Sequence, residues 1–220
     1  MFTGLIAETG RIVSVTPTQG AMRIVVHAPT LAKQLREGDS IAVSGVCLTA
    51  LDIKADQFTA DLAAETIART SLSRLQASSV VNLELPTASG SPLGGHIVQG
   101  HVDGVARLLE ISPLHPEARE TTDWILRIDV PGLLERYVVE KGSITIEGIS
   151  LTVAKIESGV VTVAIIPHTY AATNLHTLNV GAEVNIEVDV MAKYAEQRAA
   201  QEKQREEETI TELSLIAEGY

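Results

Sequence analysis

Short stretches of alternating apolar and polar residues, rich in β-branched side chains, recur along the chain between turn-forming residues. The segment 80–85, Val-Val-Asn-Leu-Glu-Leu, alternates in this way, and a period of two predicts a strand with one buried face. We expect a short helix at 29–38, capped by Thr30 and ended by Gly38, and one or two helical turns at 64–72. The strands expected in the first half of the chain are 11–15, 22–27, 40–43, 47–53, 58–62 and 80–85.

A long self-match shows that this pattern occurs twice. The stretch 38–50 returns as 141–153, with Ser-Ile near the start, a Gly in the middle and Leu-Thr near the end of both copies. The match extends in both directions, because 2–6 aligns with 98–102. The chain is therefore one module written twice. At one matched position the first copy carries Cys47 and the second carries Ser150.

Many short strands joined by frequent turns predict an all-β fold. We expect two tandem six-stranded antiparallel Greek-key barrels, derived from the internal duplication, followed by a C-terminal α-helix. In the second copy the first strand is expected at 98–108 and the short helix at 131–140. The expected domains are 1–96, 97–190 and 191–220, with the turn-rich connector 89–95 between the barrels.

The segment 192–208 has no counterpart in the first copy and is dense in Ala, Glu, Gln, Lys and Arg. These residues favour a helix. Its apolar stripe is weak, with Met191 and Tyr194 at its start and a second small apolar face at 210–216. The pattern predicts either a solvated tail or a helix used for oligomerisation.

Composition narrows the class of protein. The 220 residues carry a formal net charge of −11, which disfavours nucleic acid and anionic membrane surfaces because both require clustered Lys and Arg. The single cysteine allows no internal disulfide. The start of the chain lacks the pattern of a signal peptide, and no apolar run approaches the roughly 18 residues that a membrane span needs. We therefore expect a soluble cytoplasmic protein.

The residues themselves leave the chemistry open. The six histidines show no metal-site spacing, and Cys47 lacks the partners of a zinc site, so no metal is expected. Cys47 is either a nucleophile or a small core residue. Residues two apart on a strand share a face, which pairs Cys47 with Thr49 and Ser150 with Thr152. Each pair either satisfies backbone groups at a turn or forms a polar notch for a planar heterocycle.

Several longer motifs resemble those of the riboflavin synthase alpha-chain family in sequence, order and spacing. The resemblance covers about residues 1–195. Ser44, Glu147 and Tyr170 depart from the usual pattern, where Asn, Asp and Leu are frequent. The motifs are Met-Phe-Thr-Gly at 1–4, Gly-Asp-Ser-Ile at 38–41 with Gly-Val-Cys-Leu-Thr at 45–49, Gly-Gly-His at 94–96 with Gly-His-Val-Asp-Gly at 100–104, Lys-Gly-Ser-Ile at 141–144 with Gly-Ile-Ser-Leu-Thr at 148–152, and Val-Asn-Ile-Glu-Val-Asp at 184–189.

The resemblance implies an enzyme that joins two molecules of 6,7-dimethyl-8-ribityllumazine. A four-carbon unit passes from one molecule to the other, giving riboflavin and 5-amino-6-ribitylaminouracil, without cofactor or metal. Each barrel would bind one lumazine. The implied assembly is a homotrimer in which the N-terminal barrel of one subunit faces the C-terminal barrel of its neighbour, and lumazine synthase is a further partner that the resemblance suggests.

By the same resemblance, the catalytic candidates are His101, Ser150, Cys47, Thr152 and Asp189. The first substrate pocket would be formed by Gly4, Leu5, Ile6, Cys47, Leu48, Thr49, Asp61, Leu62, Ala63, Ala64, Glu65 and Thr66. The second would be formed by Gly100, His101, Val102, Ser150, Leu151, Thr152, Ile166, Pro167, His168, Thr169, Tyr170 and Ala171, and Lys141 would reach the ligand of a neighbouring subunit.

Two other classes remain open. A non-catalytic lumazine- or flavin-binding protein of the same fold would keep one pocket and lose polar residues in the other copy. This chain keeps His101, Ser150, Thr152 and Asp189, which favours the enzyme. A structural trimerisation protein built on the C-terminal helix would bind no pteridine.

Overall fold

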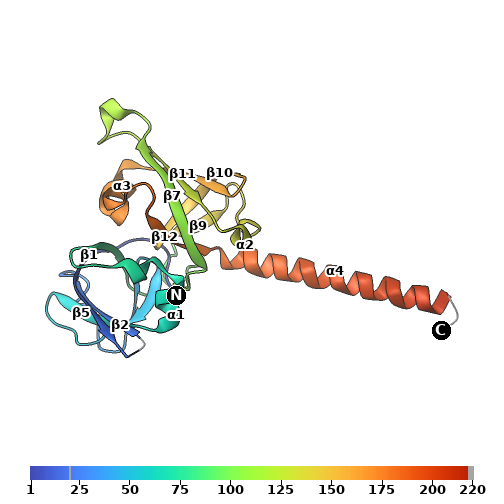
Figure 1. Ribbon diagram of the computed structural model, residues 1–220, viewed down its shortest axis with the longest axis horizontal. Coiled ribbons are helices and arrows are strands. Elements are labelled where there is room, and N and C mark those ends of the chain that lie inside the picture. The colour runs from blue at the N-terminus through green and yellow to red at the C-terminus, as the bar shows by residue number, and fades with distance from the viewer. Residues whose placement is uncertain (20, 218–220) are drawn as a thin grey trace. The chain divides into compact units, whose positions relative to one another are not determined.

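The first copy forms a six-stranded antiparallel sheet in the strand order β4-β3-β6-β1-β2-β5 (Figure 1). The computed structural model describes residues 1–19 and 21–217, and side chains as far as residue 205. After β5, the chain forms the helix α1 (Ala64–Arg69) and the 3-10 turn η1 (Ser71–Arg74). The strands are β1 (Glu8–Thr18), β2 (Ala21–His27), β3 (Ser40–Val43), β4 (Val46–Thr49), β5 (Gln57–Leu62) and β6 (Val80–Glu84).

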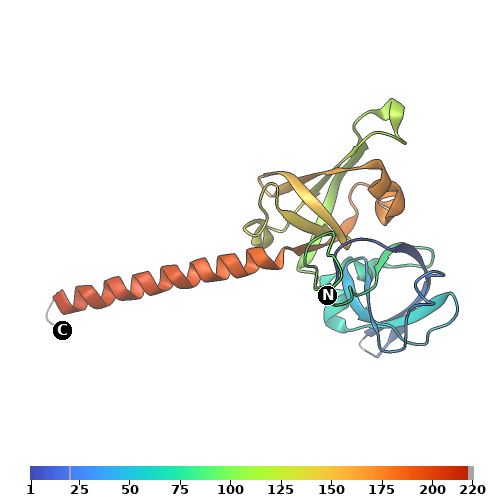
Figure 2. The ribbon, with the colours of Figure 1, turned by 180° about the vertical axis from the view of Figure 1, so that it is seen from behind.

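The second copy forms a closed six-stranded barrel in the order β10-β11-β8-β7-β12-β9, drawn from green to orange in Figure 2. Its strands are β7 (Gly104–Pro113), β8 (Trp124–Asp129), β9 (Ser143–Ile146), β10 (Ile149–Glu157), β11 (Val160–Ile165) and β12 (Glu183–Val188). Its helices and 3-10 turns are η2 (Pro116–Ala118), α2 (Gly132–Glu135), α3 (Pro167–Ala172) and η3 (Asn174–Thr177). The duplicated all-β fold expected from the sequence is thereby confirmed.

The repeated Gly lies in a tight hairpin turn in both copies. Ser44 and Gly45, between β3 and β4, have φ angles of 44° and 82°. Glu147 and Gly148, between β9 and β10, have φ angles of 52° and 79°. Two successive residues at positive φ match the twist of the flanking strands, which explains why a glycine recurs here.

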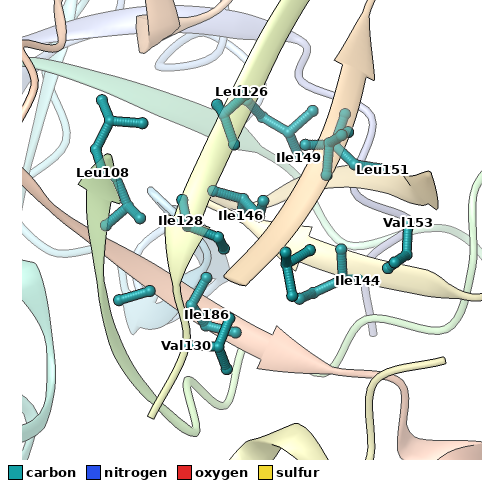
Figure 3. Close-up of a cluster of buried hydrophobic side chains, with 14 of the residues drawn as sticks. Leu108, Leu126, Ile128, Val130, Ile144, Ile146, Ile149, Leu151, Val153 and Ile186 are labelled. Carbon is teal, nitrogen blue, oxygen red and sulfur yellow. The ribbon is translucent and has the colours of Figure 1, made fainter. Parts of the chain in front are cut away.

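Strand alternation separates a packed interior from an outer face. In β10, Ile149, Leu151 and Val153 belong to the core of the barrel, as Figure 3 shows. Ser150 is half-buried and Thr152 is exposed, so this polar pair lies on the outer face. The barrel interior is filled by side chains, and a ligand would therefore bind outside it.

The expected helix at 29–38 is wrong for the first copy, because only hydrogen-bonded turns form there. The N–H groups of Thr30 and Leu31 donate to the carboxylate of Glu8 at 3.1 and 2.8 Å, so β1 supplies the cap that we expected from Thr30. Of the segment 131–140, where the second copy was expected to form the matching helix, only Gly132–Glu135 is helical. Short segments rarely propagate a helix because nucleation is costly.

Two expected strands are shorter than the pattern predicts. The strand expected at 98–108 begins only at Gly104, and Val98 instead forms an isolated bridge with Phe2. The strand expected at 47–53 ends at Thr49, where β4 gives way to a single bridge between Leu51 and Thr59. The longer β10 pairs with both β9 and β11, which closes the second barrel.

Residues 1–189 form one compact unit that contains both sheets, and residues 190–220 form another. The second unit is the helix α4 (Val190–Ala217), which confirms the expected C-terminal helix. The apolar side chains expected at 210–216 and the last three residues lie outside the described part of the chain. None of the helices in the described ranges is both long and apolar enough to cross a membrane.

Candidate functional site

The segments that precede β1 and β7 cross between the two sheets. Phe2 and Val98 pair through backbone hydrogen bonds of 2.7 and 3.1 Å. From there, the Gly4 carbonyl accepts the N–H of Ser150 in the second barrel at 2.8 Å. The Gly100 carbonyl accepts the N–H of Cys47 in the first sheet at 2.9 Å.

These backbone contacts do not follow the grouping that the resemblance implies. It placed 4–6 with Cys47 and 100–102 with Ser150, but each segment lies on the other copy. Side-chain packing agrees, because Ile6 packs against the core of the second barrel and Val102 against that of the first sheet. Each site thus combines strands of one copy with a crossing segment aligned to the other.

Both crossing segments require glycine at the point of contact. A Cβ on Gly4 would lie 2.6 Å from the Cβ of Ser150, and one on Gly100 would lie 2.7 Å from the Cβ of Cys47. The φ angles of these glycines are +76° and +79°. The backbone of each crossing segment therefore lies directly against a strand, and a side chain on either glycine would prevent this approach.

Two buried glutamates, which the sequence analysis did not select, anchor these segments. Glu84 in β6 accepts the N–H groups of Thr3 and Gly4 at 2.7 and 2.9 Å, and also the Thr3 hydroxyl at 2.7 Å. Burial raises the pKa of Glu84, while the N–H donors act in the opposite direction. The matched Glu187 in β12 accepts the N–H groups of Gln99, Gly100 and His101 at 2.7, 3.0 and 3.1 Å. The sequence does contain a signal for these two residues, because a glutamate recurs at the matched end of a buried strand in both copies.

A polar network joins the two sheets near their repeated hairpins. The amide of Asn82 donates to the Glu147 carbonyl at 2.9 Å, and that of Asn185 donates to the Ser44 carbonyl at 2.8 Å. The carboxylate of Glu147 accepts from Asn174 and from the Asn185 N–H, both at 2.8 Å. Burial raises the pKa of Glu147. This network fixes the orientation of the two sheets, and hence of the sites that they carry.

Ser150 belongs to a cluster of polar side chains in the second barrel. Its Oγ lies 2.7 Å from Nδ1 of His96, whose Nε2 lies 3.1 Å from Oγ1 of Thr145. Burial lowers the pKa of His96, and the charge of Asp189 acts in the opposite direction. A neutral imidazole has one donor and one acceptor nitrogen, so one of the two hydroxyls donates to the ring and the other accepts. His96 was not among our candidates, although Gly-Gly-His stood in a recognised motif.

The matched position in the first sheet is less polar. Cys47 pairs with Ala42 across the hairpin, where Ser150 pairs with Thr145. The residue matched to Asp189 is Pro86. The duplicated fold therefore presents one thiol site and one site with hydroxyl, imidazole and carboxylate groups.

The first site has a different ion pair at its edge. Asp61 lies in β5, two residues after Thr59, which bridges to Leu51 just beyond the end of β4. Asp61 accepts two hydrogen bonds from the guanidinium of Arg23, at 2.6 and 2.7 Å, and this contact lowers its pKa. The aligned residue in the second copy is Ala164, so the two sites also differ here.

The remaining candidates fall into three groups. Leu48, Leu62 and Leu151 lie in the cores, so only their backbone is available on the outer face. Thr49, His101, Lys141 and Thr152 are exposed. The candidates after β5 and β11 lie on α1 and α3 or, for Ala63 and Ile166, at their N-caps, and neither helix has a buried residue. Within the described residues no cluster of His, Cys, Asp or Glu could hold a metal ion.

These features define a protein with two β-barrel-like repeats and a candidate site on the outer face of each. The chain matches the family described as "Lumazine binding domain" over residues 3–86 and 99–189. It is 46% identical to a riboflavin synthase of Actinobacillus pleuropneumoniae over 90% of this chain and 89% of that one. It is 38% identical to that of Bacillus subtilis over 100% of both chains.

Solved structures give the same fold. The structure of LumP complexed with riboflavin has a TM-score of 0.78 and 26% identity, and the match covers 86% of this chain and 99% of that one. The structure of LumP complexed with 6,7-dimethyl-8-(1'-D-ribityl) lumazine has a TM-score of 0.76 at 24% identity. The chain belongs to the riboflavin synthase family of lumazine-binding proteins.

Proposed function

We propose that this protein is a riboflavin synthase, a transferase that converts two molecules of 6,7-dimethyl-8-ribityllumazine into riboflavin and 5-amino-6-ribitylaminouracil. Its relatives of that name match nearly the whole chain. One structural observation carries the proposal: a single chain presents two sites of the same construction but unequal chemistry, Cys47 in one and Ser150 with His96 in the other. The reaction needs this combination, because the same molecule serves once as donor and once as acceptor of four carbons.

We assign the two lumazines to the composite sites. The first would use 47–49, 61–66 and the crossing residues 100–102. The second would use 150–152, 166–171 and the crossing residues 4–6. The support is the exchange of backbone hydrogen bonds at Cys47 and Ser150.

The chemistry divides between binding and proton transfer. Holding two rings together supplies much of the acceleration through proximity. The anion formed from the 7-methyl group of the lumazine delocalises into its ring, so a modest base such as His101, or a water that it orients, suffices to remove the proton. Ser150, Thr152 and Asp189 would stabilise charge at the second ring, and Cys47 would act at the first. No cofactor or metal enters this scheme.

We further propose that two sites meet across subunits of a homotrimer, in which Lys141 reaches the ligand of a neighbour. Exposed apolar residues support this arrangement, since Leu5 and Ile166 are 51% and 57% exposed and both belong to the second site. Two lumazine rings bound face to face would cover these apolar side chains. The association with lumazine synthase and the cytoplasmic location stay predictions.

The test is to mix the purified protein with 6,7-dimethyl-8-ribityllumazine and to record the absorption spectrum. A synthase produces the long-wavelength absorption of riboflavin. A pure binding protein, the alternative that the likeness to LumP favours, only shifts the spectrum of the ligand. A structural protein leaves it unchanged. The variants Ser150→Ala, His101→Ala and Cys47→Ser should each slow turnover more than they weaken binding, and normal turnover in all three would refute the assignment of these residues.

A further inference from the structure

The hairpin between β7 and β8 carries an insertion that the first copy lacks. In the first copy β1 ends at Thr18 and β2 begins at Ala21, whereas in the second copy residues 114–123 separate the two strands. Both views show this loop beside α3, beyond the end of the strands (Figures 1 and 2). The two copies therefore differ next to the helix that carries part of the second site.

An aromatic stack connects the insertion to α3. The ring of Trp124, the first residue of β8, lies 3.5 Å from that of Tyr170 in α3, at an interplanar angle of 11°. The guanidinium of Arg119, in the insertion, lies 5.4 Å from the centroid of the Trp124 ring. Stacked rings and a cation over a tryptophan both favour one geometry, so the three side chains form a fixed clamp on α3.

The clamp contacts α3 through Tyr170. None of the residues of α3 is buried, and Tyr170 packs against the barrel core as a partly buried residue. A cavity of 440 Å³ adjoins the helix and is lined by Arg119, Glu120, Trp124, Pro167, Tyr170, Ala171 and His176. Without the Tyr170 ring, this cavity would grow and α3 could tilt into it.

The first copy supports its helix differently. In α1 the residue aligned to Tyr170 is Ile67, which packs against the core of the first sheet, as does Met22 from β2. Ile67 and Met22 have no aromatic ring, so they cannot form a stack like that of Tyr170 and Trp124. Since α1 and α3 are matched elements of the two sites, the clamp is a difference between the sites that lies outside the strands.

We propose that Tyr170, which the resemblance places in the second pocket, acts as a positioning residue: its ring stacks on Trp124, over which Arg119 lies, and this stack sets the orientation of α3 and thereby the affinity of the second site for its lumazine. The proposal rests on the proposed function for the identity of the ligand. Thr169 lies in α3 and Ile166 is its N-cap residue, and these are the residues through which the orientation of the helix would reach the ligand.

The experiment compares Tyr170→Leu, Tyr170→Phe and Arg119→Ala in the full chain. Tyr170→Leu should raise KM for 6,7-dimethyl-8-ribityllumazine about three- to tenfold with little change in kcat, Arg119→Ala should raise it less, and Tyr170→Phe should restore the wild-type value. Arg136→Ala is the matched control, because it removes an arginine that lies 4.9 Å from the ring of Tyr137, outside the clamp. A purely structural role would lower the melting temperature without changing KM.

Trp124 is the only tryptophan, so its fluorescence reports on the clamp directly. Its emission should change in Tyr170→Leu and stay the same in Arg136→Ala. Unchanged KM in both Tyr170→Leu and Arg119→Ala would overturn the proposal, and if Tyr170→Leu fails to fold, Arg119→Ala alone decides. If the wild-type protein makes no riboflavin, the proposed function fails, while the affinity of each variant for the lumazine, measured by equilibrium dialysis, still tests the clamp.

Discussion

Ser150 and Cys47 occupy matched places on the two sheets but have different neighbours. Ser150 contacts His96 and lies across the hairpin from Thr145, whereas Cys47 lies opposite Ala42. The substitution of Ser for Cys is thus accompanied by changes that make the surroundings of this position more polar in the second copy. At the residue scale the Cys/Ser difference could be predicted from the two aligned copies. The contact of His96 with Ser150 could not, because His96 reaches it from a segment far away in the sequence.

We expect His96→Gln to lower kcat by at least about tenfold, because Gln cannot accept and release a proton beside Ser150 as a neutral imidazole can. Steady-state kinetics with the lumazine measures this effect. The control is His115→Gln, which changes an exposed histidine in the β7–β8 hairpin. Equal rates in the two variants would show that His96 does not take part.

The depressed pKa of His96 predicts a pH dependence. Burial keeps the ring neutral at pH values where a free histidine, with a pKa near 6.5, is already half protonated. Stability contributed by this group is therefore present above pH 6.5 and lost as the pH falls through the lower pKa of the folded state. Activity that depends on neutral His96 should fall in the same window. A pH–rate profile checks this, and the acidic limb should flatten in His96→Gln.

At the scale of elements, the crossing segments are the feature that the repeat could not predict. Alignment pairs each segment with its own copy, and only tertiary contacts show that Gly4 lies on β10 and Gly100 on β4. The strands were predictable because their burial follows a period of two. The helix expected at 29–38 does not form: the segment makes only hydrogen-bonded turns, and the N–H group of Thr30 donates to Glu8, 22 residues away.

Glu187→Gln tests the crossing. Glu187 belongs to the second barrel but holds the segment that covers Cys47 in the first sheet. A glutamine amide would face backbone N–H groups with its own N–H, which should cost about 1–3 kcal/mol of unfolding free energy. It should also speed the reaction of Cys47, the only cysteine, with a thiol reagent.

Glu84→Gln is the matched variant, since it loosens the other crossing segment. It should destabilise the protein by a similar amount, measured by urea unfolding, and leave the thiol reactivity of Cys47 close to wild type. If Glu84→Gln exposes Cys47 more than Glu187→Gln does, the crossed construction of the sites is wrong.

At the scale of the whole molecule, the two sheets form a unit of their own and α4 forms another. The duplication, the all-β class and the terminal helix could all be predicted, because each has a period or a composition that the chain displays. The contacts between the sheets could not, since Asn82, Asn185 and Glu147 are polar residues that become a network only in the folded state.

Removal of residues 190–220 should leave the two sheets folded, because residues 1–189 form their own compact unit. If α4 serves oligomerisation, the truncated chain should fall from trimer to monomer mass in light scattering, with the loss of most activity. The exposed Met191 and Tyr194 near the start of α4 are the apolar contacts on which this expectation rests. A truncated protein that remains trimeric would remove this role from the helix.

The central claim is that one chain supplies two unequal sites for two copies of one molecule. The most direct measurement counts, by chromatography, the lumazine consumed against the riboflavin and the 5-amino-6-ribitylaminouracil formed. Two molecules of 6,7-dimethyl-8-ribityllumazine should disappear for each riboflavin and each uracil product that form. Ligand that binds and is recovered unchanged, or riboflavin formed without the uracil product, would contradict it.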